Sequence, residues 1–393
     1  MTWRVVTDVP YGNACDISIG TEGDVSVISF ASDPHGGPES LWFCLRLEKL
    51  TSEEETESVK LILKYPENML GASDPRKIRP VIRSQPTGNW RRMEAGVPEE
   101  TRDGRLQVVW TLERPDDSID IAFCYPYGLP ELESLVTDTD GYWKLDRVGV
   151  SQGARPLVRL SNYGDSQEPR DGVFVIARQH SGETPGSWVL DGFLRRAATM
   201  GSEAPFVWAI PLANMDGVEE GHYGKDGYPY DLNRAWGTPP MRHEALVYRR
   251  DMERWFSRCR PAIALDFHAP GCCESSGIYA FLPSPEKYPE AHAESSRLAM
   301  RIGDELDTYA AEDFARVASY ASRWDTPGFT SHCCSKGLIS MALETPYSQI
   351  GDVVLTRRHY REAGSRIAEA VVDFLNGETG GASTPKTDIY GIV

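Results

Sequence analysis

The sequence lacks long apolar runs and a cysteine framework. Its 393 residues contain no apolar stretch near the roughly 18 residues that a membrane-spanning helix needs, so no membrane association is expected. Met1 to Arg4 do not lead into an apolar segment, so no secretory signal peptide is predicted. The eight cysteines form no Cys-x-x-Cys pair and no regular spacing, which favours reduced thiols and a cytoplasmic protein.

Basic residues are scarce relative to acidic ones. With 41 Lys and Arg against 58 Asp and Glu, the formal net charge is −17, which argues against a general nucleic-acid-binding surface. The sequence also has no phosphate-binding Gly-x-x-x-x-Gly-Lys-Ser/Thr loop and no His-Glu-x-x-His pattern. Nucleotidase and zincin mechanisms therefore lack the motifs on which they depend.

Short strands dominate the first part of the chain. Candidate strands cover residues 24–30, 41–50, 58–65, 79–85, 105–112 and 119–125. They are partly alternating in polarity and are separated by turn-rich segments rather than by helical patterns. This arrangement predicts a small antiparallel β-sandwich domain over residues 1–128.

The pattern changes after this region. Nearly continuous apolar runs at 173–177, 206–211, 262–267 and 338–343 predict strands buried on both faces. Helical patterns alternate with them at 187–199, 244–258, 291–309 and 359–376. We therefore predict an α/β catalytic domain over residues 129–377, followed by a loose Gly- and Ser-rich tail over 378–393.

Histidines and glutamates, which can bind a metal ion, follow three of these apolar runs. His180 and Glu183 follow the first run, His268 ends the third, and Glu344 ends the fourth. The carboxyl ends of strands in an open α/β sheet form the ligand-binding edge, so these side chains are expected to converge. Two imidazoles and one carboxylate are a typical ligand set for a catalytic Zn²⁺ with an open position. We therefore predict one zinc ion per chain.

Residues near this predicted metal site can be assigned the other roles that hydrolysis requires. Glu344 is predicted to accept a proton from the attacking water and to deliver it to the leaving group. Asp231 is predicted to orient a ligand histidine through its second ring nitrogen. Arg234 would polarise the substrate carbonyl, and Asn233 would help to hold the substrate.

Each of these signals, taken alone, has an ordinary structural explanation. A His-x-x-Glu spacing occurs by chance, a histidine at a strand end is usually a satisfied structural residue, and Glu344 could belong to a cap or a salt bridge. Only their common order after buried strands favours the metal site over these alternatives.

The same motifs resemble those of the zinc metallocarboxypeptidase family, specifically its cytosolic carboxypeptidase branch. The resemblance rests on residues 178–187, 214–218, 231–236, 266–268 and 343–345, and extends to the β-rich segments 41–46, 83–92 and 123–127. It implies an α/β/α sandwich with a mixed sheet behind a small β-sandwich domain, a single zinc ion held by His180, Glu183 and His268, and release of a C-terminal amino acid.

Two departures from the family pattern bear on the substrate. The family places an arginine in the stretch that corresponds to residues 221–227, where this chain has none. Lys225 or His222 could substitute, although lysine lacks the planar fork of arginine. A second arginine, expected near Gly328, is absent as well, and Tyr320 is the candidate for the tyrosine that covers the substrate.

Three functions therefore remain open at this stage. The first is a zinc metallocarboxypeptidase that acts on the C-terminal tail of a peptide or protein or on an isopeptide-like bond. The second is a zinc amidohydrolase or deacylase on a small amide, which the missing arginines favour. The third is a binding protein whose catalytic machinery has decayed, against which the retained ligands and Glu344 argue.

Overall fold

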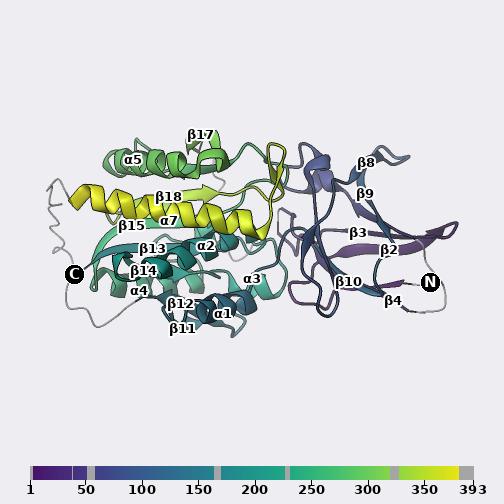
Figure 1. Ribbon diagram of the computed structural model, residues 1–393, viewed down its shortest axis with the longest axis horizontal. Coiled ribbons are helices and arrows are strands. Elements are labelled where there is room, and N and C mark those ends of the chain that lie inside the picture. The colour runs from purple at the N-terminus through teal and green to yellow at the C-terminus, as the bar shows by residue number, and fades with distance from the viewer. Residues whose placement is uncertain are drawn as a thin grey trace.

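A computed structural model describes residues 3–37, 39–50, 58–162, 170–225, 231–318 and 327–379. The molecule is elongated, with the N-terminal strands at one end and a helix-covered sheet at the other (Figure 1). Tyr320 and the tail beyond residue 379 lie outside the described residues. None of the described helices combines the length and apolarity needed to cross a membrane.

Two five-stranded sheets form the N-terminal end. One has the order β1 (Trp3–Val6), β4 (Cys44–Lys49), β10 (Ser118–Ala122), β6 (Val81–Ser84) and β7 (Arg91–Arg92), with all neighbours antiparallel. The other has the order β2 (Cys15–Glu22), β3 (Val25–Ala31), β5 (Ser58–Lys64), β9 (Leu106–Glu113) and β8 (Val97–Glu100). Ile28 and Leu61 from one sheet and Leu45 and Ile121 from the other belong to a common buried hydrophobic cluster.

One pair in this region differs from the predicted antiparallel arrangement. β3 and β5 pair in parallel, with Ile28 opposite Leu61. The chain leaves this sheet after β3, contributes β4 to the other sheet, and re-enters beside β3 in the same direction. A crossover of this kind produces a parallel pair without an intervening helix.

The larger part of the chain forms one eight-stranded mixed sheet. Its order is β11 (Lys144–Val150), β12 (Pro156–Ser161), β14 (Phe206–Ile210), β13 (Asp171–Ala177), β15 (Arg260–His268), β18 (Ile339–Glu344), β16 (Ile278–Leu282) and β17 (Ala310–Val317). The central strands β14, β13, β15 and β18 are mutually parallel, and β16 is parallel to β17. The pairs β11–β12, β12–β14 and β16–β18 are antiparallel. The predicted α/β fold with a mixed sheet is therefore confirmed.

Helices cover both faces of this sheet. The predicted helices are present as α2 (Thr184–Met200), α4 (His243–Phe256), α5 (Pro289–Leu306) and α7 (Arg357–Thr379), and α1 (Leu129–Asp138), α3 (Met215–Glu219) and α6 (Phe329–Cys334) are additional. Phe174 packs against Trp255 of α4, whereas Phe267 packs against Phe193 of α2. Since Phe267 pairs with Ala177, three residues beyond Phe174, the two rings point to opposite faces.

Helix α2 is held closely by its neighbours. A Cβ atom on Gly192 would lie 2.1 Å from the Arg361 carbonyl oxygen, and one on Gly364 would lie 1.9 Å from that of Val189. The two glycines therefore allow the backbones of α2 and α7 to approach directly, which a larger residue at either position would prevent.

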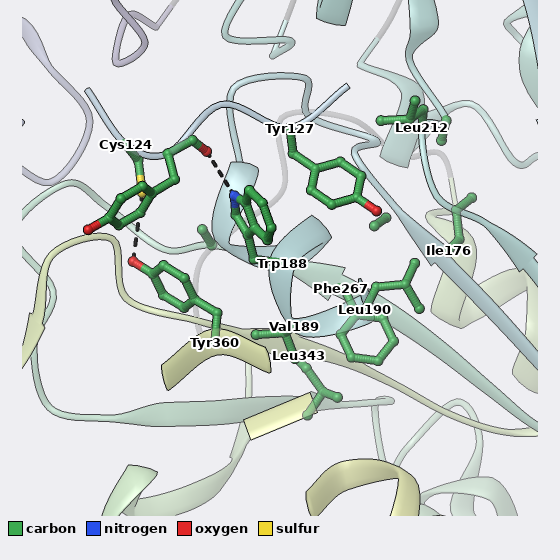
Figure 2. Close-up of a cluster of buried hydrophobic side chains, with 14 of the residues drawn as sticks. Cys124, Tyr127, Ile176, Trp188, Val189, Leu190, Leu212, Phe267, Leu343 and Tyr360 are labelled. Carbon is green, nitrogen blue, oxygen red and sulfur yellow. Dashed lines mark hydrogen bonds between the residues drawn. The ribbon is translucent and has the colours of Figure 1, made fainter. Parts of the chain in front are cut away.

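Trp188 of α2 also contacts the last part of the N-terminal β region (Figure 2). Its indole nitrogen donates to the Tyr125 carbonyl at 3.0 Å, and its ring packs edge-on against Tyr127. Beside it, Cys124 Sγ lies 3.7 Å from the Tyr360 hydroxyl of α7. Cys124, Tyr125 and Tyr127, which come just before the predicted domain boundary, are thus buried against α2 and α7. The boundary at residue 128 stays a prediction.

Candidate metal centre

The ends of three neighbouring parallel strands carry the candidate site. β13, β15 and β18 lie side by side, with Ala177 opposite Phe267 and His268 opposite Glu344. After β13 the chain passes through α2 to β14 on one side, and then through α4 to β15 on the other side. The strand order therefore reverses between β13 and β15, which is where open α/β sheets form their binding crevice.

A tight turn after β13 brings His180 and Glu183 together. Arg178 adopts a left-handed conformation with φ of 62°, and its buried guanidinium donates to the carbonyl oxygens of Ser181 and Tyr127. The Glu183 amide donates to the His180 carbonyl at 3.2 Å, and α2 starts at the next residue. The left-handed backbone conformation of Arg178 is unfavourable, and the hydrogen bonds of its guanidinium stabilise the turn in spite of it. Strained residues of this kind are common at functional sites.

Glycine at position 186 brings this turn close to β15. A Cβ atom on Gly186 would lie 2.5 Å from the Phe267 carbonyl oxygen. Only glycine allows the first turn of α2 to rest on the backbone that precedes His268. The side chain of Glu183, at the start of α2, therefore reaches His268.

Three donor atoms converge at this point. His180 Nδ1 lies 2.8 Å from Glu183 Oε1, and His268 Nδ1 lies 2.7 Å from Glu183 Oε2. One ligand atom from each residue lies within 4.8 Å of the others. The three residues are only 6%, 2% and 2% exposed in the order His180, Glu183 and His268. The structure therefore brings together the three predicted ligands in a buried group.

A carboxylate lies behind each histidine. His180 Nε2 is 3.1 Å from Oδ1 of Asp231, the residue expected to orient a ligand histidine, and His268 Nε2 is 2.8 Å from Asp266 Oδ2. Asp266 was not predicted in this role. The Gln179 amide donates to the same Asp266 oxygen and fixes the orientation of the carboxylate. The signal was present in the sequence, because residues two apart on a strand point to the same face.

The donor set fits a metal cation. An aspartate beside each Nε2 favours the neutral tautomer with its hydrogen on Nε2, which would leave a lone pair on each Nδ1 facing the oxygens of Glu183. Acceptors this close repel one another unless a positive charge lies between them. Burial disfavours charged histidines, yet the surrounding carboxylates Glu183, Asp231 and Asp266 raise the pKa of both His180 and His268. These carboxylates favour positive charge in the site, and a divalent cation bound to the three donors would supply it.

The acidic partners show the reverse effect. Burial by itself would raise the pKa of Glu183 and of Asp231. The neighbouring histidines outweigh burial and hold the pKa of both carboxyls well below the usual range. Both groups are therefore ionised at neutral pH and available as a ligand and as an acceptor, respectively.

Glu344 differs from the other carboxylates of the site. Its Oε2 is buried and has no hydrogen-bond partner among the described residues. Burial, together with the charge of Glu183, raises the pKa of Glu344 to about 7, while His268 and Lys225 oppose the shift. A carboxylate with a pKa near neutrality and an unpaired oxygen is suited to proton transfer.

Lys225 is the cationic side chain that faces these carboxylates. Burial would lower its pKa, but the charges of Glu183, Glu39 and Glu344 outweigh burial and raise it. Its Nζ lies 3.3 Å from Oε2 of Glu39, and 5.5 Å from the centre of the Tyr223 ring. The N-terminal β region, which contains Glu39, therefore contributes a carboxylate next to the candidate site.

Two other residues predicted to contact the substrate, His222 and Asn233, interact with groups of the protein itself. The ring of His222 stacks on His35 at 4.2 Å, and its Nε2 lies 3.5 Å from Glu220. The Asn233 amide is engaged at both ends, because Oδ1 accepts from the Phe329 amide and Nδ2 donates to Asp266. Substrate binding by His222 and Asn233 stays a prediction, and so does that of Tyr320, which the structure does not describe.

Arg234 lies half-buried beside the same group. Its Nη1 donates to the Asn233 carbonyl at 2.8 Å, and its charge contributes to the lowered pKa of Asp231. The guanidinium is thus oriented by the backbone next to the carboxylate that supports His180. Its contact with a substrate stays a prediction.

Comparisons with known proteins point to one enzyme family. No protein-family model matches the chain. Human cytosolic carboxypeptidase 6 is 26% identical over 371 residues, which cover 85% of this chain and 71% of the human protein. Mouse cytosolic carboxypeptidase 6 is 28% identical over 189 residues, a match that spans 42% of this chain and 35% of the mouse protein.

Solved structures share the fold over nearly the whole chain. A metallo-carboxypeptidase from Burkholderia cenocepacia aligns with a TM-score of 0.75 at 17% identity, covering 96% of this chain and 100% of the other. A metallo-carboxypeptidase from Pseudomonas aeruginosa aligns with a TM-score of 0.71 at 19% identity, covering 95% of this chain and 100% of the other. At these identities the similarity supports the fold, including the strands that precede the large sheet.

Proposed function

The chain belongs to the metallocarboxypeptidase family, in the branch of the cytosolic carboxypeptidases, and we propose that it hydrolyses the C-terminal peptide bond of a peptide or protein with one zinc ion. His180, Glu183 and His268 would hold the ion through two Nδ1 atoms and a carboxylate. The observation that carries the proposal is the convergence of these three donors in a buried group, with an aspartate behind each histidine.

Zinc at this position would act as a Lewis acid and lower the pKa of water towards neutrality. Glu344 would accept the proton of the attacking water at its unpaired Oε2. Because burial raises the pKa of Glu344 above its usual value, the same carboxyl group could then donate that proton to the leaving amine. Glu344 lies opposite His268 at the strand ends, which supports its proposed role as the base beside the proposed ligands.

Lys225 and Arg234 are the proposed partners of the negative charges on the substrate. The charges of Glu183, Glu39 and Glu344 raise the pKa of Lys225, so it stays protonated. It would stabilise the developing oxyanion or bind the terminal carboxylate. Arg234 is oriented by the Asn233 carbonyl and would take the other of these roles. Asn233 would contribute mainly by supporting Asp266, since both ends of its amide are engaged.

The test compares the wild type with Glu344→Gln on a panel of small peptides with free C-termini. We expect about one zinc per chain in both proteins, because Glu344 is not a ligand. Turnover should fall by about 100-fold to 10,000-fold in the variant, the range ascribed to a general base. Unchanged turnover in Glu344→Gln would refute the assigned mechanism, and absence of zinc from both proteins would refute the ligand set.

A second candidate is hydrolysis of an amide without a free terminal carboxylate, as by a deacylase. The engaged amide of Asn233 favours it, because this side chain would have to break two hydrogen bonds to contact a terminal carboxylate. Rates on a peptide and on its C-terminal amide separate the two candidates. Loss of activity on the amide supports the carboxypeptidase, and equal rates support the amide hydrolase.

A further inference from the structure

A cavity of about 1000 Å³ lies away from the strand-end site, where the N-terminal β region meets α2 and α7. Its α2 residues begin at Gly192, eight positions beyond Thr184. At 1.5 Å per residue this is about 12 Å along the helix from the turn that carries Glu183. The cavity is therefore separate from the candidate metal centre.

Arginines from three elements line this cavity. They are Arg91 and Arg92 of β7, Arg195 and Arg196 of α2, and Arg357, Arg358 and Arg361 of α7. One carboxylate, Glu362, is among the lining residues, and it lies 3.1 Å from the Arg366 guanidinium. Such a concentration of positive charge is unexpected on a chain with a formal net charge of −17.

Four of these arginines have acidic or carbonyl partners within the protein. Arg195 and Arg361 each bind the buried Oδ1 of Asp191 at 2.7 Å, and Arg196 lies 2.7 Å from Glu369. Arg92 donates to the carbonyl oxygens of Arg79 and Tyr347, both at 2.8 Å. These contacts hold the walls of the cavity in place.

The other three form no ion pair with any carboxylate of the described ranges. Arg91 and Arg358 are exposed, and Arg357 is half-buried. The Arg357 guanidinium lies 5.9 Å from the centre of the Tyr125 ring and 5.7 Å from that of Trp188. Aromatic stacking of this kind orients a guanidinium without neutralising its charge.

The backbone adds to this positive field. Arg357 and Arg358 form the first turn of α7, a 23-residue helix whose N-terminus borders the cavity. The first amides of a helix have no partner within the helix and carry a partial positive charge. Anions bind at such helix starts, and here arginine side chains flank the same position.

We propose that this cavity binds a small polyanion that carries phosphate or carboxylate groups. Guanidinium forks pair with both groups in bidentate geometry, and the three unpaired arginines supply the forks. A cavity of this volume accommodates a small organic ligand, and the rings of Trp90 and Tyr125 provide apolar wall for its carbon skeleton. This site does not depend on the proposed peptidase activity.

Titration calorimetry on the 393-residue, zinc-loaded chain at low salt tests the proposal with sodium tripolyphosphate and citrate as probes. We expect wild-type protein to bind at least one of them. The double variant Arg357→Gln plus Arg358→Gln should bind it about 10-fold to 100-fold more weakly, because two of the guanidinium groups that pair with the anion are removed. This loss corresponds to about 1.4–2.7 kcal/mol. Tighter binding of tripolyphosphate would identify a phosphorylated ligand, and tighter binding of citrate a polycarboxylate.

The matched control removes the same charge elsewhere. Arg250→Gln plus Arg254→Gln changes two exposed arginines of α4 that do not line the cavity, and it should leave binding unchanged. If the α7 double variant fails to fold by circular dichroism, Arg91→Gln on β7 replaces it. Absence of binding by the wild type, or equal weakening in cavity and control variants, would overturn the proposal. Binding that survives the cavity variants unchanged would reflect chelation of zinc and would overturn it equally.

Discussion

The strand-end site and the arginine-lined cavity gather opposite charges in one molecule. At the strand ends, Glu183, Asp231, Asp266 and Glu344 surround two histidines and face one lysine. In the cavity, three arginines remain without a carboxylate among the described residues. The charges of the first region therefore favour binding of a cation, and those of the second favour binding of an anion.

The two regions also differ in burial, which changes how strongly each should hold its ligand. The three candidate metal ligands are at most 6% exposed, and each is oriented by a hydrogen bond. The unpaired arginines reach solvent and are oriented by rings and by the helix start. Buried, oriented donors give tight and salt-insensitive binding, whereas exposed charges are screened.

Removal of one ligand should produce the largest effect. In His268→Ala we expect loss of stoichiometric zinc and a fall in turnover of about 1000-fold, since Lewis-acid stabilisation contributes several kcal/mol to the transition state. His292→Ala on α5 is the matched control, because His292 lies outside the site and bonds the Pro283 carbonyl. Retention of one zinc by His268→Ala would contradict the assigned ligand set.

Removal of a carboxylate behind a histidine should have an intermediate effect. Asp231→Asn and Asp266→Asn should each weaken zinc binding by about 10-fold to 100-fold, as the loss of such partners usually does. Competition with a chromogenic chelator measures the change, with the exposed Asp313→Asn as control. An affinity equal to wild type in both variants would show that the aspartates do not support the ligands.

The pH profile should report on Glu344, which acts as a base only when it is ionised. Burial raises its pKa to about 7 without a cation, and a bound cation lowers it. Activity should therefore be lost as the pH falls, with the acid limb of kcat/KM between about pH 4.5 and 7. A limb above this range, or a flat profile through it, would contradict the assignment.

A change in ionic strength should have the smallest of the predicted effects, and it should affect ligand binding in only one of the two regions. Raising NaCl from 0.1 M to 1 M shortens the screening length from about 10 Å to 3 Å. Probe binding at the exposed arginines should weaken several-fold, while zinc content should stay constant. Equal sensitivity of both ligands would remove the distinction between a buried and an exposed site.

Much of the fold could be predicted from the sequence. Apolar runs at 173–177, 206–211, 262–267 and 338–343 correspond to β13, β14, β15 and β18, because strands buried on both faces have a simple composition. The two outer strands on each side of the sheet, β11, β12, β16 and β17, were missed. β11 and β17 have partly exposed faces that mix polar and apolar residues, so they lack a clear signal. β16 is a short, buried apolar run, which composition alone does not distinguish from a buried helical segment.

The candidate site was more visible in the sequence than the cavity for the same physical reason. Each predicted ligand follows a recognisable strand, and parallel strands end at one edge of a sheet. The arginines of the cavity belong to β7, α2 and α7, and only tertiary packing brings them together. The two glycines at the α2–α7 contact, Gly192 and Gly364, carried no sequence signal for that packing.

Anomalous X-ray diffraction at the zinc absorption edge, on crystals grown with zinc, tests the central claim most directly. We predict one strong peak per chain, about 2.0–2.2 Å from Nδ1 of His180, Nδ1 of His268 and a carboxylate oxygen of Glu183. A peak at other residues, or no peak at these three donors, would contradict the metal centre and the mechanism derived from it.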